Sequence, residues 1–543
     1  MTGLFHFLFA FLFAGLLPLY LPNLPPAAAA ATPAPGPPPM SDAPLVRTEA
    51  GAVRGRRTAA GVLVFKSVPY AAPPVGARRF AAPAPHPPWP GVRDATRGGP
   101  TAPFNRPAAG EQLDDHPIFG PGWVRGDDYL TTNIWTPGLT GPARPVLVFI
   151  HGGAFVVGTG DVPLYDGTSF ARKGVVLVTL NYRLGIEGFL KIDGVPSNLG
   201  LRDQLAALRW VRDNIARFGG DPANVTIFGE SAGAMSVGIL LTSPAAKGLF
   251  RRGIMMSGSG QAVFTGEQAG RVARKFASVL RIPNTRAAYA RLSPAQLLAA
   301  QTKVTPRMVK LETDEAADPT GGLALFFPVI DGDIIPAVPL RSAQQGAGGT
   351  AELLLGYNTD EVNLFLVPTG LLKKIKLDFI LSKAIKTVHP APRELIAVYR
   401  KAYPHKTRGE LFSAVLTAYQ FQVPSVRYAD AHARQPGRTY LYEFGWPSSV
   451  AGGAYGAYHG LGLPFVFNQR ALATGPRGML GPAGGPAALA ENMQNAWIAF
   501  ARTGSPGWAA YTAEGRQTMR LGASWQLQTN PHAAELRAWD GVR

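Results

Sequence analysis

Residues 225–241 read VTIFGESAGAMSVGILL, and this stretch decides the fold. Residues 225–228 are rich in β-formers, and residues 232–241 are apolar enough to continue as a buried helix. A serine on such a sharp strand-to-helix turn is pushed above the sheet, with the helix N-terminus pointing at it. The pattern G-x-S-x-G alone arises by chance in a chain with 63 glycines, but a strand before it and a helix after it are its expected context. We therefore predict Ser231 as a nucleophile; the alternative is a Gly/Ser turn without chemistry.

A second motif follows another apolar strand. Residues 146–150 read VLVFI and lead directly into His151, Gly152 and Gly153. Adjacent glycines after a buried strand allow backbone N–H groups to turn toward a ligand, and the N–H of Ala232 directly follows the nucleophile. Gly152, Gly153 and Ala232 are therefore predicted to form an oxyanion hole, with a tight turn that closes the strand as the alternative. The place of His151 beside the glycines favours a structural role over that of a base.

The order of further motifs resembles that of the type-B carboxylesterases, the cholinesterase-like branch of the α/β-hydrolase fold. The resemblance covers most of the chain, and it is carried by residues 68–76 (VPYAAPPVG), 127–135 (DDYLTTNIW), 181–185 (NYRLG), 201–204 (LRDQ), 218–222 (FGGDP), 493–495 (MQN) and 497–501 (WIAFA). It implies an α/β fold with a mostly parallel central sheet and helices on both faces, formed by residues 45–543 as a single domain. Residues 261–301 and 368–435 lack family motifs and look helical, so we expect them to form cap insertions.

The resemblance implies a chain order of serine, acid and histidine. The histidines beyond the acid region are His389, His405, His432, His459 and His532. Only His459 lies in a glycine-flanked loop before an apolar segment, residues 463–467, and this segment resembles the family's histidine motif. Gly462 stands where the family commonly has an acidic residue. We predict His459 as the base, with a structural loop histidine as the alternative.

Candidates for the acidic residue of the triad follow a third apolar strand. Residues 352–356 (ELLLG) predict a buried strand, and YNTDE follows at its carboxyl end, where active sites of open α/β sheets gather. The family pattern places its catalytic glutamate at Glu361, although Val362 replaces the usual glycine. Either carboxylate has the chemistry to orient an imidazole, so Asp360 stays open as the alternative.

Three further sets of charges are interpreted with the help of the resemblance. Glu230 lies beside the nucleophile and is predicted to be an active-site auxiliary that tunes the field at the imidazolium. Two buried ion pairs that hold loops to the core are expected by family analogy, Arg79–Asp127 and Arg183–Asp203.

The chain contains no cysteine, although export normally invites disulfides. Family members often close a loop with a disulfide between two positions that are Ala102 and Tyr129 here. Neither of these two positions is a cysteine in this chain. The absence of this disulfide and the Ala/Gly/Pro/Arg-rich composition together predict a bacterial protein of the periplasm.

The N-terminal residues differ in composition from the rest. Residues 4–21 are apolar apart from His6, and residues 27–31 are all alanine, the layout of a secretory signal with its cleavage zone. No Lys or Arg precedes the apolar run, and its length makes a retained membrane anchor the alternative. We predict that residues 1–31 are a signal peptide cleaved between about Ala28 and Thr32, and that residues 32–44 are a disordered Pro/Ala-rich linker.

The net charge is +18, from 53 Lys and Arg against 35 Asp and Glu. Such an excess raises the local concentration of anions, but the arginines are dispersed and no nucleic-acid-binding module is recognised. One dense basic run is threaded through apolar residues and consists of Lys373, Lys374, Lys376, Lys383 and Lys386. We interpret it as a solvated helix face, with a guide for anionic or membrane-bound esters as the alternative.

These features predict a secreted or periplasmic serine carboxylesterase that needs no cofactor and no metal. Ser231 attacks the ester carbonyl, His459 takes and returns the proton, and Glu361 orients His459. Some bacterial members of the family cleave tricarballylate esters of mycotoxins, so anionic polycarboxylate esters such as those of the fumonisin type are candidate substrates. The alternatives are a surface-active lipase and a non-catalytic cholinesterase-like binding module. Membrane association is expected only through an uncleaved N-terminus, and the sequence leaves the oligomeric state open.

Overall fold

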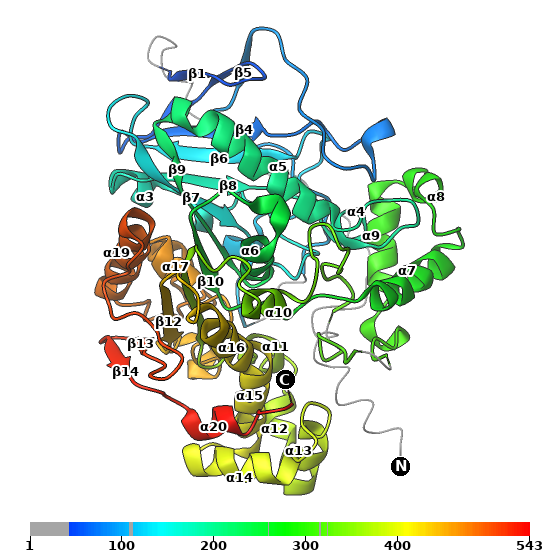
Figure 1. Cartoon of the computed structure of the whole chain (residues 1–543), viewed down its shortest axis with the longest axis vertical. Coiled ribbons are helices and arrows are strands. Elements are labelled where there is room, and N and C mark those ends of the chain that lie inside the picture. The colour runs from blue at the N-terminus through cyan, green and yellow to red at the C-terminus, as the bar shows by residue number, and fades with distance from the viewer. Residues whose placement is uncertain (1–42, 108–111, 259, 314–315, 323, 543) are drawn as a thin grey trace.

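A sheet of 11 strands runs through the molecule in the order β14-β13-β12-β11-β10-β9-β7-β8-β6-β4-β3 (Figure 1). The computed structural model describes residues 43–542 apart from 108–111, 259, 314–315 and 323, so the predicted signal peptide and residues 32–42 of the linker lie outside it. Within the described residues the strands of this sheet are β3 (Arg56–Arg57), β4 (Leu63–Pro69), β6 (Thr131–Thr136), β7 (Arg144–Ile150), β8 (Val176–Leu180), β9 (Gly220–Glu230), β10 (Arg252–Met256), β11 (Glu352–Asn358), β12 (Thr439–Phe444), β13 (Thr518–Leu521) and β14 (Gln526–Gln528). A smaller sheet pairs β1 (Leu45–Arg47), β2 (Ala52–Arg54) and β5 (Val92–Asp94).

The seven central strands, from β8 to β13, are parallel, and antiparallel pairs occur only at the two edges of this sheet. Ile150 pairs with Gly229 between β7 and β9, and Glu230 pairs with Met256 between β9 and β10. Met256 pairs in turn with Gly356 of β11. The carboxyl ends of four neighbouring strands therefore lie at one level, where ligands bind in open α/β sheets.

Helices cover both faces of the sheet, as the sequence predicts. In β7, Val146, Val148 and Ile150 belong to one hydrophobic cluster, and Leu147 and Phe149 belong to the other. This alternation follows from the two-residue period of a strand. The first cluster includes α5 (Leu199–Asn214), α6 (Ala232–Thr242), α10 (Pro339–Gln344) and α16 (Val423–His432), and the second includes α3 (Thr168–Arg172), α17 (Leu463–Val466) and α19 (Ala487–Thr503).

The two stretches predicted to be helical insertions are helical. The first contains α7 (Gly266–Leu280), α8 (Arg286–Ala290) and α9 (Pro294–Lys303); the second contains α12 (Leu371–Lys374), α13 (Asp378–Ile385), α14 (Pro392–Ala402), α15 (Arg408–Thr417) and α16. Capping boxes begin α7, α9 and α15, so the local sequence fixes these helix starts. In Figure 1, α7–α9 lie along one side of the molecule and α12–α14 at its lower end, so the insertions form two separate groups.

The predicted ion pair between Arg183 and Asp203 is present. The guanidinium forms bonds of 2.6 and 2.8 Å to the two carboxylate oxygens, and the side chains are 1% and 0% exposed. The pair joins the segment after β8 to α5. Removing either partner would leave a buried charge without compensation.

The predicted pair between Arg79 and Asp127 is wrong. Arg79 instead pairs at 2.8 Å with Glu187 of α4 (Gly185–Phe189). Asp127 is exposed to water, which satisfies its charge, whereas Glu187 is largely buried and needs a cation. The hydroxyl of Tyr129, at the position where the family has a cysteine, donates to Glu187 at 3.1 Å. A polar network therefore holds Tyr129, one end of the loop that lacks a disulfide.

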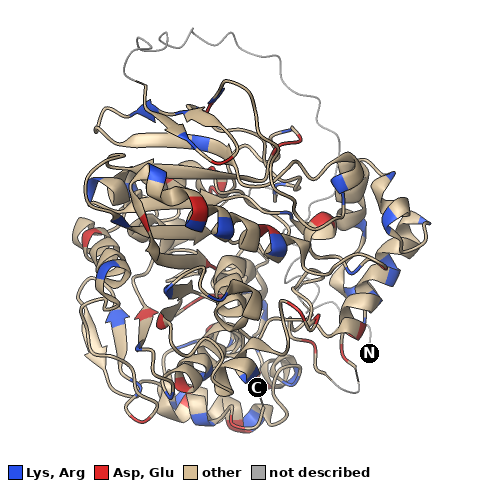
Figure 2. Cartoon of the chain, turned by 45° about the horizontal axis from the view of Figure 1, so that its top comes forward, with Lys and Arg blue, Asp and Glu red and all other residues tan. Residues whose placement is uncertain are grey.

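The charges of the surface are distributed widely. Lys and Arg positions occur on most of the outer helices and are not gathered in one region (Figure 2). Among the residues that the structure describes, no helix is long and apolar enough to cross a membrane.

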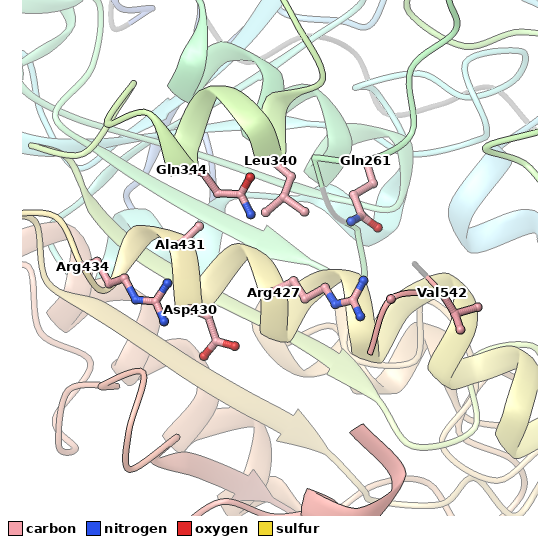
Figure 3. Close-up of a pocket in the computed structure, with 9 residues that line it drawn as sticks. Gln261, Leu340, Gln344, Arg427, Asp430, Ala431, Arg434 and Val542 are labelled. Carbon is pink, nitrogen blue, oxygen red and sulfur yellow. The ribbon is translucent and has the colours of Figure 1, made fainter. Parts of the chain in front are cut away.

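A surface pocket of about 570 Å³ lies between α10, α16 and the C-terminal residues (Figure 3). Its polar lining comes from Gln261, Gln344, Arg427, Asp430 and Arg434. No residue that the sequence predicts for the active site lines this pocket, so the site lies elsewhere.

Candidate active site

The sharp turn predicted at Ser231 is present between the end of β9 and the start of α6. Ser231 has φ 57° and ψ −122°, a backbone conformation that costs free energy for a residue with a side chain. The surroundings enforce it, because the N–H of Ser231 donates to the carbonyl of Met256 at 2.9 Å. A Cβ on Gly233 would lie 2.0 Å from the carbonyl oxygen of Ile150, so only glycine fits there. The serine is thereby held at the carboxyl edge of the sheet and at the N-terminus of α6.

The loop after β7 brings the predicted oxyanion donors to this turn. Residues 153–155 have positive φ angles of 104°, 53° and 62°, which turn the chain back across the edge of the sheet. A Cβ on Gly152 would lie 3.1 Å from the Cβ of Ser231, so this glycine packs directly against the serine. Within the part of the chain that the structure describes, the N–H groups of Gly152, Gly153 and Ala232 donate to no protein acceptor. These three N–H groups thus remain available to a ligand oxygen.

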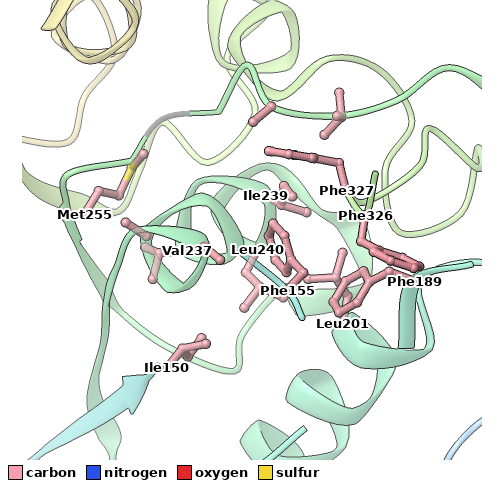
Figure 4. Close-up of a cluster of buried hydrophobic side chains, with 14 of the residues drawn as sticks. Ile150, Phe155, Phe189, Leu201, Val237, Ile239, Leu240, Met255, Phe326 and Phe327 are labelled. Carbon is pink, nitrogen blue, oxygen red and sulfur yellow. The ribbon is translucent and has the colours of Figure 1, made fainter. Parts of the chain in front are cut away.

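Apolar side chains of the hydrophobic core pack against this loop (Figure 4). The ring of Phe155 packs against Phe189 of α4 and Phe327, with centroids 4.7 and 5.7 Å away. Ile150, Leu201 and Leu240, from β7, α5 and α6, lie in the same cluster. The positions of the backbone donors are therefore fixed by the core.

The structure brings His459 and Glu361 together. Nδ1 of the imidazole lies 2.7 Å from Oε2 of Glu361, whose side chain is fully buried. The other carboxylate oxygen accepts the N–H of Asn358 at 2.7 Å, and the N–H of His459 donates to the carbonyl of Glu361 at 3.2 Å. Because Nδ1 is engaged, Nε2 is the ring nitrogen left for proton transfer.

The alternative acid, Asp360, is not placed beside His459. Its carboxylate accepts the hydroxyl of Thr359 at 2.7 Å and the N–H of Ala457 at 3.1 Å, and Lys406 lies 3.8 Å away. These partners account for both oxygens of Asp360. Of the two carboxylates left open by the sequence, only Glu361 contacts the imidazole.

The other late histidines are occupied elsewhere. His389 contacts Ala538 and His432 contacts Thr439. His532 contacts Glu443 at 2.6 Å, and His405 is exposed.

His151 is buried and stacks on Tyr182, and burial lowers the pKa of its imidazole to about 4. A neutral His151, with Nδ1 2.8 Å from the carbonyl of Gly152, lies in the loop that carries the predicted oxyanion donors.

Glu230 faces the other side of the imidazole. Its Oε1 lies 3.3 Å from Nε2 of His459, and its side chain is 9% exposed. Burial raises the pKa of Glu230 to about 7, with the imidazolium opposing and Glu361 adding to this shift. Burial alone would lower the pKa of His459, but the charges of Glu230 and Glu361 outweigh it and raise that pKa to about 9. The two carboxylates therefore favour a positively charged imidazole.

Two aromatic residues at the site were not predicted. Phe365, on α11 (Asn363–Leu366), and Phe421 pack on the ring of His459, with centroids 5.6 and 4.9 Å away. Phe421 lies on a π-helix, Ala418–Gln422, between α15 and α16. Such single-turn insertions are frequent at functional sites. No sequence motif marks this turn, so only the tertiary structure reveals its contact with the imidazole.

The arrangement has the parts that acyl transfer needs. A serine on a strained turn, an imidazole held by a buried carboxylate and N–H groups without a protein acceptor all lie at the carboxyl edge of the sheet. Among the described residues, no group of three or more His, Asp or Glu side chains is placed to hold a metal ion.

Comparisons with known proteins identify the family of the chain. The sequence pattern of the carboxylesterase family matches residues 42–539. The chain is 36% identical to the para-nitrobenzyl esterase of Bacillus subtilis (strain 168), covering 90% of this chain and 97% of that one. It is 35% identical to the phenmedipham hydrolase of Pseudarthrobacter oxydans, covering 86% and 91% of the two chains. The crystal structure of the carboxylesterase EST55 of Geobacillus stearothermophilus superposes with a TM-score of 0.78 at 36% identity, over 91% of this chain and 99% of that one.

The mostly parallel sheet with helices on both faces is therefore an α/β-hydrolase fold. The chain belongs to the carboxylesterase family. It is a carboxylic ester hydrolase, as the sequence motifs predict, and the esterase relatives argue against the alternative of a non-catalytic binding module.

Proposed function

We propose that the chain is an exported serine carboxylesterase that works through an acyl-enzyme. Ser231 is the nucleophile, His459 the general base and acid, and Glu361 the residue that orients His459. Gly152, Gly153 and Ala232 supply the oxyanion hole. The observation that carries the proposal is the 2.7 Å contact of Glu361 with Nδ1, which leaves Nε2 of a buried imidazole for proton transfer.

The proposed reaction has two halves. The hydroxyl oxygen of Ser231 attacks the ester carbonyl carbon while Nε2 of His459 accepts the hydroxyl proton. The carbonyl oxygen becomes an oxyanion that the free N–H groups stabilise. Collapse expels the alcohol, which takes the proton from His459 and leaves Ser231 acylated. In the second half, water gives its proton to His459 and attacks the acyl carbon, and the carboxylic acid leaves as Ser231 regains its proton.

Single and double substitutions test this assignment. Ser231→Ala is expected to lower kcat by about 10⁶, with folding intact, because no acyl-enzyme forms. His459→Ala is expected to cost about as much, and adding it to Ser231→Ala should cost almost nothing more, because the two residues act as one unit. Glu361→Gln should lose less, and Asp360→Asn, which does not touch the imidazole, serves as the matched control and should be nearly silent.

A covalent label provides an independent check. A paraoxon-type organophosphate carries a phosphorus that mimics the attacked carbonyl carbon, so it should modify Ser231 alone. The label is located by mass spectrometry of peptides. Retention of more than about a hundredth of the activity in Ser231→Ala, or a label on another residue, would contradict the mechanism.

For the substrate, we propose carboxylic esters with anionic acyl groups, including fumonisin-type tricarballylate esters. The support is the net charge of +18, which raises the concentration of anions near the protein. Two named relatives, a para-nitrobenzyl esterase and a phenmedipham hydrolase, support small-molecule substrates in general.

For the location, we propose export through residues 1–31. Expressed in a Gram-negative host, the mature chain should begin between about Ala28 and Thr32, following the small-residue rule for cleavage sites. N-terminal sequencing of the purified enzyme measures this. Met1 or Thr2 at the N-terminus of membrane-bound enzyme would instead indicate a retained anchor.

A further inference from the structure

Two neighbouring apolar side chains at the start of α13 are exposed to water. Phe379 is 62% exposed and Leu377 is 53% exposed. Among the described residues, no large apolar side chain is more exposed than Phe379. The rest of the helix is ordinary, because Leu381 and Ile385 are fully buried against the core. Exposure of this kind has a free-energy cost that a contact surface would recover.

Lysines flank this apolar pair in the sequence. Residues 371–386 contain five lysines and one acidic residue, and all five lysines are exposed. Phe379 and Lys383 on α13 and Lys386 at its C-cap have the spacing i, i+4 and i+7, which places them on one face of the helix, opposite the buried residues. Lys373 and Lys376 precede the pair in the chain.

The negative charge of Asp378, the one acidic residue of this segment, is more than balanced by neighbouring arginines. The carboxylate of Asp378 contacts the guanidinium groups of Arg400 on α14 and Arg408 on α15. The surface formed by Leu377, Phe379 and the exposed Lys373, Lys376 and Lys386 therefore keeps a positive charge around an apolar centre.

We propose that this surface docks the enzyme on a membrane that contains anionic lipids. Phe379 and Leu377 insert at the level of the headgroups, and the lysines contact lipid phosphates while their methylene stems lie along the apolar boundary. The charge complementarity selects this partner. An acidic protein or a nucleic acid would match the lysines, but the exposed apolar pair is accounted for by a surface with both a negative charge and an apolar interior. This route is additional to an uncleaved N-terminal segment.

The docking surface is joined to the active site by two structural connections. The chain runs from Phe365, which packs on His459, through α11 into α12 and α13. The same insertion continues from α15 into the π-helix that carries Phe421, the second ring on His459. If the proposed esterase mechanism holds, docking at α12–α13 would bring membrane-partitioned esters near this side of the enzyme. The docking itself does not depend on that mechanism.

Vesicle co-sedimentation tests the proposal with the full chain. One set of vesicles contains phosphatidylcholine alone, and the other contains equimolar phosphatidylcholine and phosphatidylglycerol. The charge variant is Lys373→Gln/Lys376→Gln/Lys386→Gln, and its matched control is Lys247→Gln/Lys303→Gln/Lys310→Gln, three lysines that are also exposed but lie elsewhere. Each removes the same charge. A lysine near an anionic surface contributes about fivefold in partitioning, so the first variant should lose about a hundredfold on anionic vesicles and the control far less.

The apolar contribution is tested separately. Leu377→Gln/Phe379→Gln should weaken binding to the anionic vesicles, whereas Met308→Gln/Leu472→Gln, also exposed apolar residues, should not. Hydrolysis of a soluble nitrophenyl ester should be unchanged in all four variants, which separates docking from the esterase mechanism. Equal losses in the two lysine variants would show that only global charge matters. No effect of Leu377→Gln/Phe379→Gln, or equally tight binding to soluble polyglutamate, would assign the surface to an acidic protein and overturn the proposal.

Discussion

Glu230 and His459 are two titratable side chains that face one another in a buried site, with Oε1 and Nε2 3.3 Å apart. The imidazole can act as a base only when it is neutral, yet Glu230 and Glu361 together raise its pKa. Of these two carboxylates, Glu361 binds Nδ1 and fixes the ring, whereas Glu230 lies at the nitrogen that would exchange the proton. The charge of Glu230 therefore opposes the resting form that the base requires and stabilises the imidazolium that forms during reaction.

This opposition predicts a shift in the pH profile. Replacing Glu230 with Gln removes a negative charge near Nε2, so the pKa of His459 should fall. Because activity is lost as pH falls through that pKa, the acidic limb of kcat/KM should move to lower pH by about one unit. The maximal rate should also decrease, since the imidazolium loses a stabilising charge. A pH–rate profile with a neutral ester measures both effects, and a limb that stays in place or moves upward would show that Glu230 does not set the charge of His459.

The elements that the sequence made predictable are those whose signal is local. Residues 225–241 contain both the strand and the helix that hold Ser231, and the structure places β9 and α6 there. The contact of His459 with Glu361 needed the family resemblance in addition, because Asp360 offers the same chemistry one residue earlier. Contacts between residues far apart in the sequence were harder to predict. Arg79 pairs with Glu187 and not with Asp127, because burial of α4 selects the partner, and burial is not encoded in a motif. Phe421 reaches His459 from a π-helix that has no sequence signature.

At the level of elements, α20 (Ala533–Arg537) is held to β12 by His532, the residue directly before this helix. His532 Nε2 lies 2.6 Å from Glu443, and its Nδ1 lies 3.7 Å from Glu535 and 3.3 Å from the hydroxyl of Tyr403. Burial lowers the pKa of His532, but its bonds to the two carboxylates outweigh burial and raise that pKa to about 9. The protonated imidazole thus holds the C-terminal helix against the sheet.

This contact predicts a pH-dependent stability. A histidine whose pKa is raised in the folded state binds its proton more tightly there, so its contribution is complete below about pH 6.5, its ordinary pKa. The contribution is lost as pH rises toward about 9. The free energy of unfolding of wild type should therefore exceed that of His532→Gln at pH 6, and the difference should shrink by pH 9. Urea denaturation at both pH values measures this difference, and Lys303→Gln, an exposed change elsewhere, is the control. A difference that grows with pH would contradict the assignment.

For the molecule as a whole, the charge distribution is the property that relates fold to substrate. Basic residues outnumber acidic ones by 18, and Figure 2 shows them spread over the outer helices. An even distribution gives a long-range attraction for anions, whereas the concentrated lysines of residues 373–386 give a local one. Both the overall positive charge and the lysines of residues 373–386 attract anions, but they lie at different positions. Variants of these lysines therefore distinguish the local attraction from the overall one.

The dependence on ionic strength tests whether this charge guides substrate. Salt shortens the Debye length from ~10 Å at 0.1 M to ~3 Å at 1 M, so attraction between exposed charges is largely screened at the higher concentration. For esters of polycarboxylic acids, kcat/KM should fall steeply over this range, while neutral esters of similar size should respond little. The variant Lys373→Gln/Lys376→Gln/Lys386→Gln should reduce this salt response more than Lys247→Gln/Lys303→Gln/Lys310→Gln if the run steers the substrate, and both should reduce it equally if net charge alone does. Equal salt responses for anionic and neutral esters would remove the support for polycarboxylate substrates and leave the lysine run without a role in catalysis.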